Sequence, residues 1–362
     1  MMSQLRKLAS LKITLLGMVL LAIGAALSYG NPHDMPIWVL VVPMALLAVN
    51  LVAAITTNPR INRQPGLLVF HICLLLILVL VTIGRFIHLD AHIEMVQGSA
   101  FDPDQLMEVN AGPLHAGSLQ DVHFVQGPYT VEYAAGLRRG LTHSFVKVET
   151  FSGEWQDREV GDDRPLVLNG YRFYTTFNKG FAPILSWQST SGAQVKGVVH
   201  MPSYPLFDYK QDNRWTPPGT NEDIRFWLQL DTGLKDDAAW ILDGRTSSGV
   251  LVVTSQNARH ELKVGESIGL HGGTLRYEGL TTWMGYRIFY DPTIQWLFVV
   301  AVTGVLGLAH YFWRKINLQA WMDEAPDPLS EDFVKPVGTI DGQTSHSSAD
   351  KLSAPMATGD SN

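Results

Sequence analysis

The chain has 362 residues, of which 46% are hydrophobic and only 17% are charged. This balance excludes an ordinary soluble enzyme, because soluble domains carry about 25% charged residues. A formal net charge of -7 without a basic stripe excludes nucleic acid as an expected partner. The single cysteine, Cys73, excludes an intramolecular disulfide and a two-cysteine redox pair.

Four apolar blocks are each long enough to cross a lipid bilayer as a helix. They are Ile13 to Tyr29, Pro36 to Thr56, Leu67 to Gly84 and Ile294 to Trp313. A helix that rises 1.5 Å per residue needs about 20 residues to cross the hydrocarbon core. The first block could be a cleaved secretory signal, but it is longer than a signal core of about 7 to 15 residues. A retained first helix is the simpler interpretation.

Lysine and arginine residues in the short loops predict the orientation. They precede the first block, lie between the second and third, and follow the fourth, whereas the loop "GNPHDM" has none. Both termini are therefore predicted to be cytoplasmic. The expected organisation is a cytoplasmic N-terminus (1–12), three transmembrane helices (13–88), a large extracytoplasmic domain (89–292), a fourth transmembrane helix (293–315) and a disordered, apolar-poor cytoplasmic tail (316–362).

The extracytoplasmic segment has the period-two pattern of β-strands. Runs such as "VHFVQGPYTVEY" and "IRFWLQL" alternate apolar and polar residues, and the second is either a core strand or an interaction surface. Asn169 with Gly170, and Gly272 with Gly273, are hairpin signals. "LNGYRFYTT" and "WMGYRIFYD" share a core and predict two similar strands. We expect an antiparallel β-rich sandwich or open barrel, with a short helix near residues 102–109.

An imidazole lies inside the third apolar block. His71 is about 6 Å from the predicted cytoplasmic boundary, and Thr82 and Arg85 share its helical face. The face is predicted to contact protein, because lipid cannot satisfy an imidazole or a guanidinium. Neutral imidazole is a common axial ligand of haem iron, and an arginine can pair with a haem propionate. The alternative is an interhelical hydrogen bond, worth about 0.6 to 2 kcal/mol.

The cysteine and one further histidine lie close to this position in the predicted helices. Cys73 is roughly 200° around the helix from His71, so it cannot share a metal with it and is predicted to be a packing residue. His310 lies near the end of the fourth block, at nearly the depth of His71. It is either a second haem ligand or an interface residue.

Three of the histidines on the predicted outer side lie close to the membrane-spanning blocks. His88 and His92 would share a face if the third helix continued past the membrane, and such a pair can bind metal or haem or simply be solvated. His33, in the short outer loop, has the same two interpretations. The sequence contains no nucleophile elbow, phosphate loop or HExxH motif, so no catalytic residue is predicted.

Three segments together resemble the ResB family of cytochrome c biogenesis proteins, also called CcsB. They are "RKLASLKITLLGMVLLAIG", "FHICLLLILVLVTIG" and "GLTTWMGYRIFYDPTIQWLFVVAVTGVLGLAHYFW", about a quarter of the chain. The family pattern is an "LxSLKxTL" start, a histidine early in the third membrane helix, and "DP" before the last helix. Asp291 and Pro292 stand at that last position.

The resemblance implies a subunit of the system II cytochrome c maturation machinery in the bacterial inner membrane. Such a subunit works with a ResC/CcsA-type membrane protein to carry haem b across the bilayer and present it to exported apocytochrome c. The family's histidine matches His71, which implies an axial ligand to haem iron. The "WGxxWxWD" segment of the partner family is absent, so we expect this chain to act within a haem-lyase complex and not alone. A non-haem membrane-anchored scaffold or binding module is the alternative.

Overall fold

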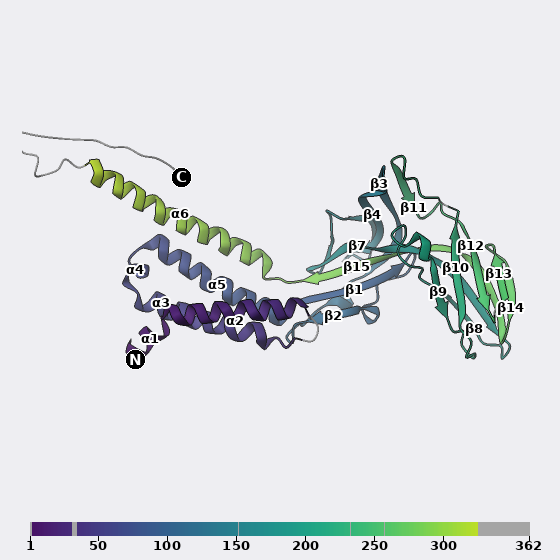
Figure 1. The fold of residues 1–362 in the computed structure, drawn as a ribbon, viewed down its shortest axis with the longest axis horizontal. Helices are drawn as coiled ribbons and strands as arrows, with labels where there is room; N and C mark the ends of the chain where they lie inside the picture. Colours follow the sequence, from purple (N-terminus) through teal and green to yellow (C-terminus); the bar gives the residue numbers. More distant parts are fainter. Residues whose placement is uncertain (1, 31–34, 151, 232, 257, 325–362) are drawn as a thin grey trace, which may run out of the picture. The chain divides into compact units, whose positions relative to one another are not determined.

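Figure 1 shows the computed structural model, which describes residues 2–30, 35–150, 152–231, 233–256 and 258–324. The chain divides into two compact units, Met1–Phe312 and Trp313–Asn362. The first unit contains the described strands and most of the helical residues. The second unit is described up to Glu324, where it is helical. His33 and the expected tail beyond residue 324 lie outside the described residues.

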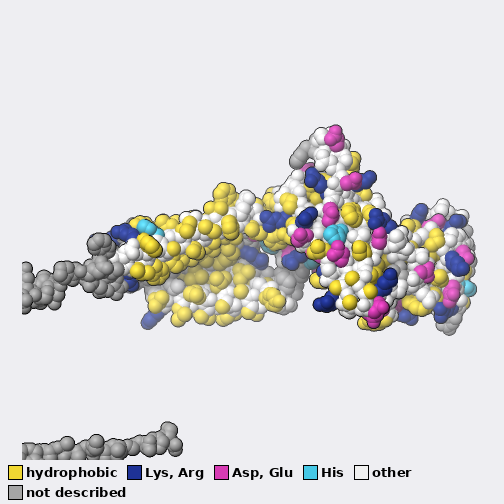
Figure 2. Space-filling model, turned by 90° about the horizontal axis from the view of Figure 1, so that it is seen from above, with side chains coloured by type: hydrophobic (Ala, Val, Ile, Leu, Met, Phe, Trp, Pro, Cys, Tyr) yellow, Lys and Arg dark blue, Asp and Glu magenta, His cyan; other side chains and the backbone are white. Residues whose placement is uncertain are grey.

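Within the described residues, four helices are long and apolar enough to cross a membrane, as predicted. They are α2 (Leu11–Gly30), α3 (Trp38–Thr57), α5 (Pro65–Ile87) and the span Ile294–Asn317 of α6 (Ile294–Glu324). Two short helices, α1 (Met2–Leu8) and α4 (Pro59–Asn62), accompany them. Hydrophobic side chains cover the helices in Figure 2, and charged side chains gather over the β-sheets. Helix α6 continues through residues 316–324, which the sequence assigned to the tail.

Asn50 is a buried polar residue inside α3. Its side-chain amide donates to the carbonyl groups of Leu8 and Ser10, and its Oδ1 accepts a hydrogen bond of 2.7 Å from the Thr14 hydroxyl. Apolar surroundings make such partners obligatory. The segment "LASLKITL" therefore has a structural role, because it fixes the start of α2 against α3.

The largest sheet is antiparallel, with the order β2-β1-β15-β7-β6, and β14 and β8 pair with β15 and β7. Its strands are β1 (Leu89–Val96), β2 (Met107–Ala111), β6 (Leu166–Leu168), β7 (Tyr171–Ser189), β8 (Gln194–Val198), β14 (Ser267–Leu270) and β15 (Gly273–Tyr290). The two similar segments predicted from the sequence lie side by side, since Tyr174 of β7 faces Arg287 of β15. Along β1, buried and half-buried residues alternate.

Two four-stranded antiparallel sheets complete the β-domain, which we define as residues 89–290. One has the order β11 (Trp240–Asp243), β3 (Phe124–Ala134), β4 (Arg138–Glu149) and β5 (Trp155–Gly161). The other has the order β13 (Ala258–Leu262), β12 (Gly249–Ser255), β10 (Ile224–Leu230) and β9 (Asp212–Trp215). Strand β10 is the "IRFWLQL" segment, and it buries Ile224, Phe226 and Leu228 in the core.

Tyr286 connects the largest sheet to the β3–β4 sheet through a buried polar network. Its hydroxyl donates to Gln126 Oε1 at 2.7 Å and lies 2.7 Å from the Ser144 hydroxyl. The Gln126 amide also donates to the Ser144 hydroxyl at 2.9 Å. All three side chains are buried. The network satisfies polar groups that would otherwise be costly inside this core.

Two local predictions about the β-domain need correction or adjustment. The helix expected at residues 102–109 is a single 3₁₀ turn, Pro103–Gln105, followed by β2, because residues from Met107 onward pair with β1. Asn169 and Gly170, with φ of 50° and 84°, form the predicted turn between β6 and β7. In the second hairpin the turn is shifted by one residue, since Leu270 pairs with Gly273 and Gly272 has φ of 87°.

Candidate functional site

Helices α5 and α6 pack closely through small residues. The contacts pair Gly66 with Gly307, Cys73 with Gly304, and Gly84 with Asp291 and Thr293 at the start of α6. A Cβ added at Gly66 would lie 2.5 Å from the Gly307 carbonyl oxygen, so no larger side chain fits. Small residues permit such close approach of membrane helices. Cys73 is buried in this interface, which confirms its predicted packing role.

The "DP" motif fixes the beginning of α6. Asp291 Oδ1 accepts hydrogen bonds from the Thr293 backbone at 2.9 Å and the Thr293 hydroxyl at 2.7 Å. The Thr293 carbonyl then accepts the first helical bond from Leu297 at 2.9 Å. These bonds satisfy groups that a helix N-terminus leaves free. The motif therefore positions α6 against Gly84, at the end of α5.

His71 lies on the side of α5 that faces away from α6. It is two residues from both Val69 and Cys73, which contact α6, and two residues correspond to roughly 200° around a helix. The His71 ring is half-buried, and its Nδ1 lies 2.7 Å from the Leu67 carbonyl oxygen. Because a carbonyl oxygen only accepts hydrogen bonds, the proton of a neutral ring must be on Nδ1. The lone pair is then on Nε2, which has no hydrogen-bond partner among the described residues.

The outer part of the same face contacts α3 and ends at Arg85. The Thr82 hydroxyl bonds to the Leu78 carbonyl at 2.7 Å and lies 3.8 Å from the Met44 sulfur of α3. Arg85 Nε is buried without a hydrogen-bond partner, and no carboxylate pairs with this arginine among the described residues. Buried cations are normally paired, so Arg85 has unused capacity to bind an anion.

The three predicted haem-binding residues do not form one site in this chain. His71 and Arg85 share a face but are fourteen residues apart, ~21 Å along the helix axis, which exceeds the reach of one porphyrin from its iron to its propionates. His310 is exposed and lies on α6 near Gly307, which packs at the Gly66 level of α5. Since His71 faces away from α6, the structure does not bring His71 and His310 together.

His88 and His92 do not form the predicted helical pair, because α5 ends at Ile87 and β1 begins at Leu89. His88 is buried, and its Nδ1 lies 3.1 Å from the Arg85 carbonyl oxygen. Burial, with the nearby Arg85 charge, lowers the pKa of His88 below its usual value. This ring is therefore neutral at pH 7 and structural.

A loop of the β-domain caps the end of α5. The backbone groups of Gly112 and Leu114 donate to the carbonyls of His88 and Phe86 at 2.9 and 2.8 Å. His115 Nδ1 lies 2.9 Å from the Ile87 carbonyl, and its Nε2 lies 3.0 Å from the Tyr171 hydroxyl. This satisfies carbonyls at the helix C-terminus that have no helical partner. His115 has no local sequence signal, since its partners Ile87 and Tyr171 are far away in the chain.

A groove of about 1250 Å³ lies between the edge strands β5 and β6. Its walls include Gln156 and Arg158 of β5 and Leu166 to Leu168 of β6. Strands at sheet edges carry unpaired backbone groups that can bind an extended peptide. The described residues contain no group of three or more His, Cys, Asp or Glu side chains that could hold a metal ion.

No protein-family model matches the chain, and no curated protein matches it. Among solved structures, the chain is similar to one titled "Cytochrome c Heme Lyase CcmF", with 13% identity and a TM-score of 0.27. The likeness covers 84% of this chain and 35% of that chain, so this chain spans about a third of that protein's length. A likeness with this TM-score carries no argument about fold or activity.

Proposed function

We propose that the chain is a subunit of the system II cytochrome c maturation machinery in a bacterial inner membrane. With a ResC/CcsA-type partner it would transport haem b across the bilayer and present it to exported apocytochrome c. The termini would be cytoplasmic, and the β-domain would lie on the outer side. The proposal rests on the order of the ResB-like segments and, above all, on the geometry of His71.

The ring of His71 is arranged as metal-ligating histidines commonly are. Such residues donate one ring N–H to a carbonyl or carboxylate, which fixes the tautomer and directs the other nitrogen to the metal. The Leu67 carbonyl, 2.7 Å from Nδ1, plays this part here. The role of His71 would be to hold haem iron through Nε2 near the predicted cytoplasmic end of α5. Because His71 faces away from α6, the opposite iron ligand would come from the partner.

Arg85 would act at the other end of the same helical face. Its Nε is buried without a hydrogen-bond partner, so a haem propionate would supply the missing negative charge. The separation of ~21 Å means that Arg85 and His71 would serve successive haem positions. This arrangement fits transport along α5 better than permanent storage at one site.

The test is the visible spectrum of the complex purified with its partner. In His71→Gly the bound haem should fall several-fold, because the axial bond is lost and a cavity is left. Added imidazole should restore the haem Soret band by filling that cavity as a free ligand. A role in helix packing alone would give no rescue by imidazole.

Two control variants make the result specific. Thr82→Val changes the same face of α5 without removing an imidazole, and His310→Ala removes an imidazole from the exposed side of α6. Both should keep the wild-type Soret band. A normally assembled His71→Gly complex with full, unchanged haem absorbance would refute the ligand assignment.

A second candidate is a membrane-anchored module without haem whose β-domain binds an exported protein. The groove between β5 and β6 favours it, since two sheet edges meet there. This candidate predicts that a photo-crosslinker at Val167, 55% exposed on β6, captures an exported protein while the purified complex has no Soret band. Haem delivery predicts the Soret band.

A further inference from the structure

A bulge in β7 immediately precedes a lysine that is buried in the β-domain. Thr175 pairs with Tyr286 and Lys179 pairs with Met284, so residues 176–178 lie opposite Gly285 alone. The Thr176 hydroxyl donates to the Gly285 carbonyl at 2.9 Å, and a Cβ on Gly285 would lie 2.7 Å from that hydroxyl. The bulge adds two residues, so the alternation of β7 is kept and Lys179 has the phase of the buried Phe173 and Phe181. Lys179 is 2% exposed.

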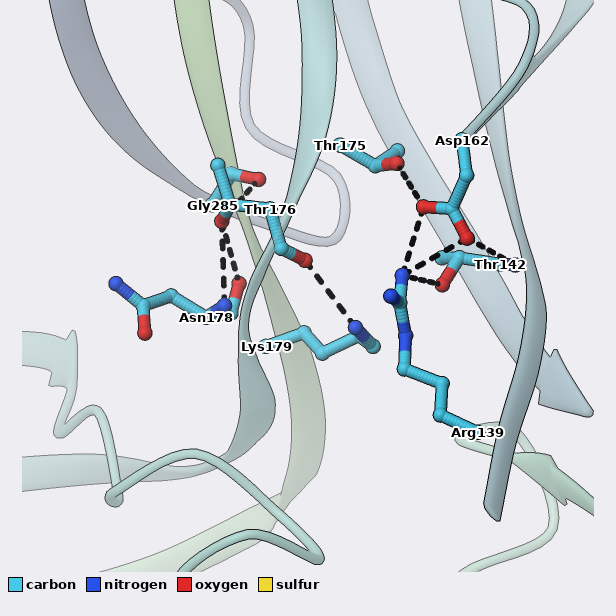
Figure 3. A network of polar contacts seen from close by, with 8 residues as sticks. All are labelled: Arg139, Thr142, Asp162, Thr175, Thr176, Asn178, Lys179 and Gly285. Atoms are coloured by element: carbon cyan, nitrogen blue, oxygen red, sulfur yellow. Dashed lines mark hydrogen bonds and ion pairs between the residues drawn. The ribbon is translucent and has the colours of Figure 1, made fainter. Parts of the chain in front are cut away.

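The ammonium group of Lys179 lacks a balancing negative charge. Its Nζ donates to the Thr176 carbonyl at 3.1 Å, and no carboxylate lies within ion-pair distance among the described residues. Arg139 approaches it from β4 in Figure 3. Burial, with the charge of Arg139, lowers the pKa of Lys179 to about 8, so most of these lysines remain charged at pH 7.

The only nearby carboxylate is already occupied by other donors in the described network. Asp162 accepts two hydrogen bonds from Arg139, of 2.7 and 2.9 Å, one from the Thr175 hydroxyl at 2.8 Å and one from the Thr142 backbone at 3.1 Å (Figure 3). Asp162 therefore neutralises Arg139. Lys179 remains as one buried positive charge in excess.

Lys179 and Arg139 are the charged residues that line a cavity of about 310 Å³. The other walls are apolar or aromatic and include Tyr133, Tyr204 and Leu206. Phe177 stands at the rim, 69% exposed, with its ring centre 4.4 Å from the Arg139 guanidinium carbon and 5.9 Å from Lys179 Nζ. The volume is at the lower end of the range for small-molecule sites, which is about 300 to 1,000 Å³.

We propose that this cavity binds a small carboxylic acid with an apolar body, whose carboxylate pairs with Lys179 while its body contacts Phe177, Leu206 and the two tyrosines. A carboxylate supplies the charge and the acceptor atoms that Lys179 lacks. The apolar walls favour a hydrophobic body over a bare anion such as phosphate. The inference does not depend on the proposed haem function.

The test uses the full chain in lipid nanodiscs and isothermal titration calorimetry. The probes are benzoate and 4-phenylbutyrate, each compared with its uncharged amide. Wild-type protein should bind the acids and not the amides. In Lys179→Met the acid affinity should fall ten- to hundredfold, the usual range for hydrogen bonds to charged groups. Lys147→Met, which changes an exposed lysine of β4, should bind like wild type.

The pH dependence provides an independent readout. Between pH 7 and 9 the acid affinity should fall about tenfold, because Lys179 loses its proton with a pKa of about 8. The other titratable groups near Lys179 keep their charge state between pH 7 and 9. Arg139 stays cationic, burial raises the pKa of Tyr133 and, to about 12, that of Tyr204, and Asp162 stays ionised because its bonds to Thr175 and Arg139 outweigh its burial and lower its pKa.

Phe177→Ala is a second variant that tests the cavity if Lys179→Met fails to fold. Phe177 is 69% exposed, so its loss should not unfold the domain. It should weaken 4-phenylbutyrate several-fold. Equal binding of acid and amide by wild type, or unchanged acid binding by folded Lys179→Met, overturns the proposal. So does a wild-type protein that binds neither acid.

Competition identifies the source of the carboxylate. If haemin displaces 4-phenylbutyrate and haemin dimethyl ester does not, the natural ligand group is a porphyrin propionate. If neither displaces it, the ligand is a smaller free acid. Either result, together with the loss of binding in Lys179→Met, supports a carboxylate site.

Discussion

The buried charge of Lys179 should make the stability of the β-domain depend on pH in a predictable direction. The fall of its pKa from 10.5 to about 8 corresponds to roughly 3 kcal/mol, at about 1.4 kcal/mol per pKa unit. Below pH 8 the folded and unfolded chains both hold this proton, so the full penalty is present. Between pH 8 and 10.5 the unfolded chain binds more protons, so the free energy of unfolding rises with pH. Above pH 10.5 the penalty is gone.

Lys179→Met removes this penalty and keeps an apolar side chain of similar length. At pH 7 the variant should exceed wild type in free energy of unfolding by roughly 3 kcal/mol, and at pH 9 by roughly 2 kcal/mol. Packing effects of the substitution are the same at both pH values. The decrease in the stability difference between pH 7 and pH 9 therefore comes from the charge of Lys179. Urea denaturation followed by tryptophan fluorescence measures both differences, with Lys147→Met as the control. A difference in free energy of unfolding between Lys179→Met and wild type that is the same at pH 7 and pH 9 would refute the reasoning.

Two further substitutions test the packing that positions the candidate sites. Gly307→Leu should separate α5 from α6 and reduce the amount of folded protein in the membrane, because a Cβ there already lies 2.9 Å from a Val69 methyl group. Gly30→Ala, where an added Cβ meets none of the described residues within 4 Å, should have no effect on that amount. Tyr286→Phe should cost about 1 to 3 kcal/mol, since Gln126 and Ser144 lose a buried partner. This corresponds to a melting temperature lower by about 2 to 12 °C in calorimetry, and an unchanged value would contradict the role of the network.

The sequence was sufficient for most of the elements but not for their pairing. The apolar block Leu67 to Gly84 became α5 because its length and composition leave no other stable state in lipid. The alternation along β1 likewise follows from its half-buried position. The pairing of β7 with β15, about a hundred residues apart in the chain, depends on tertiary packing and has no local signal.

The sequence could reveal a candidate-site residue where a polar residue interrupts an apolar segment. His71 was found in this way, and Asn50 carries the same signal inside α3. Lys179 has no comparable signal: it shares the odd-numbered phase of the buried Phe173 and Phe181 in β7, but the burial of a lysine there depends on tertiary packing. The end of α5 at Ile87 also depends on the capping loop that contains His115.

The packing of α5 has a consequence for any haem-handling role. Gly66, Cys73 and Gly84 use one side of the helix to bind α6 or the residues before it, and Thr82 contacts α3 on the side that carries His71. The His71 ring remains half-buried even so, with Nε2 free among the described residues. Lipid cannot supply a hydrogen-bond partner for this nitrogen. In the proposed haem-handling role this nitrogen would hold haem iron, and a second membrane protein would bring the opposite iron ligand.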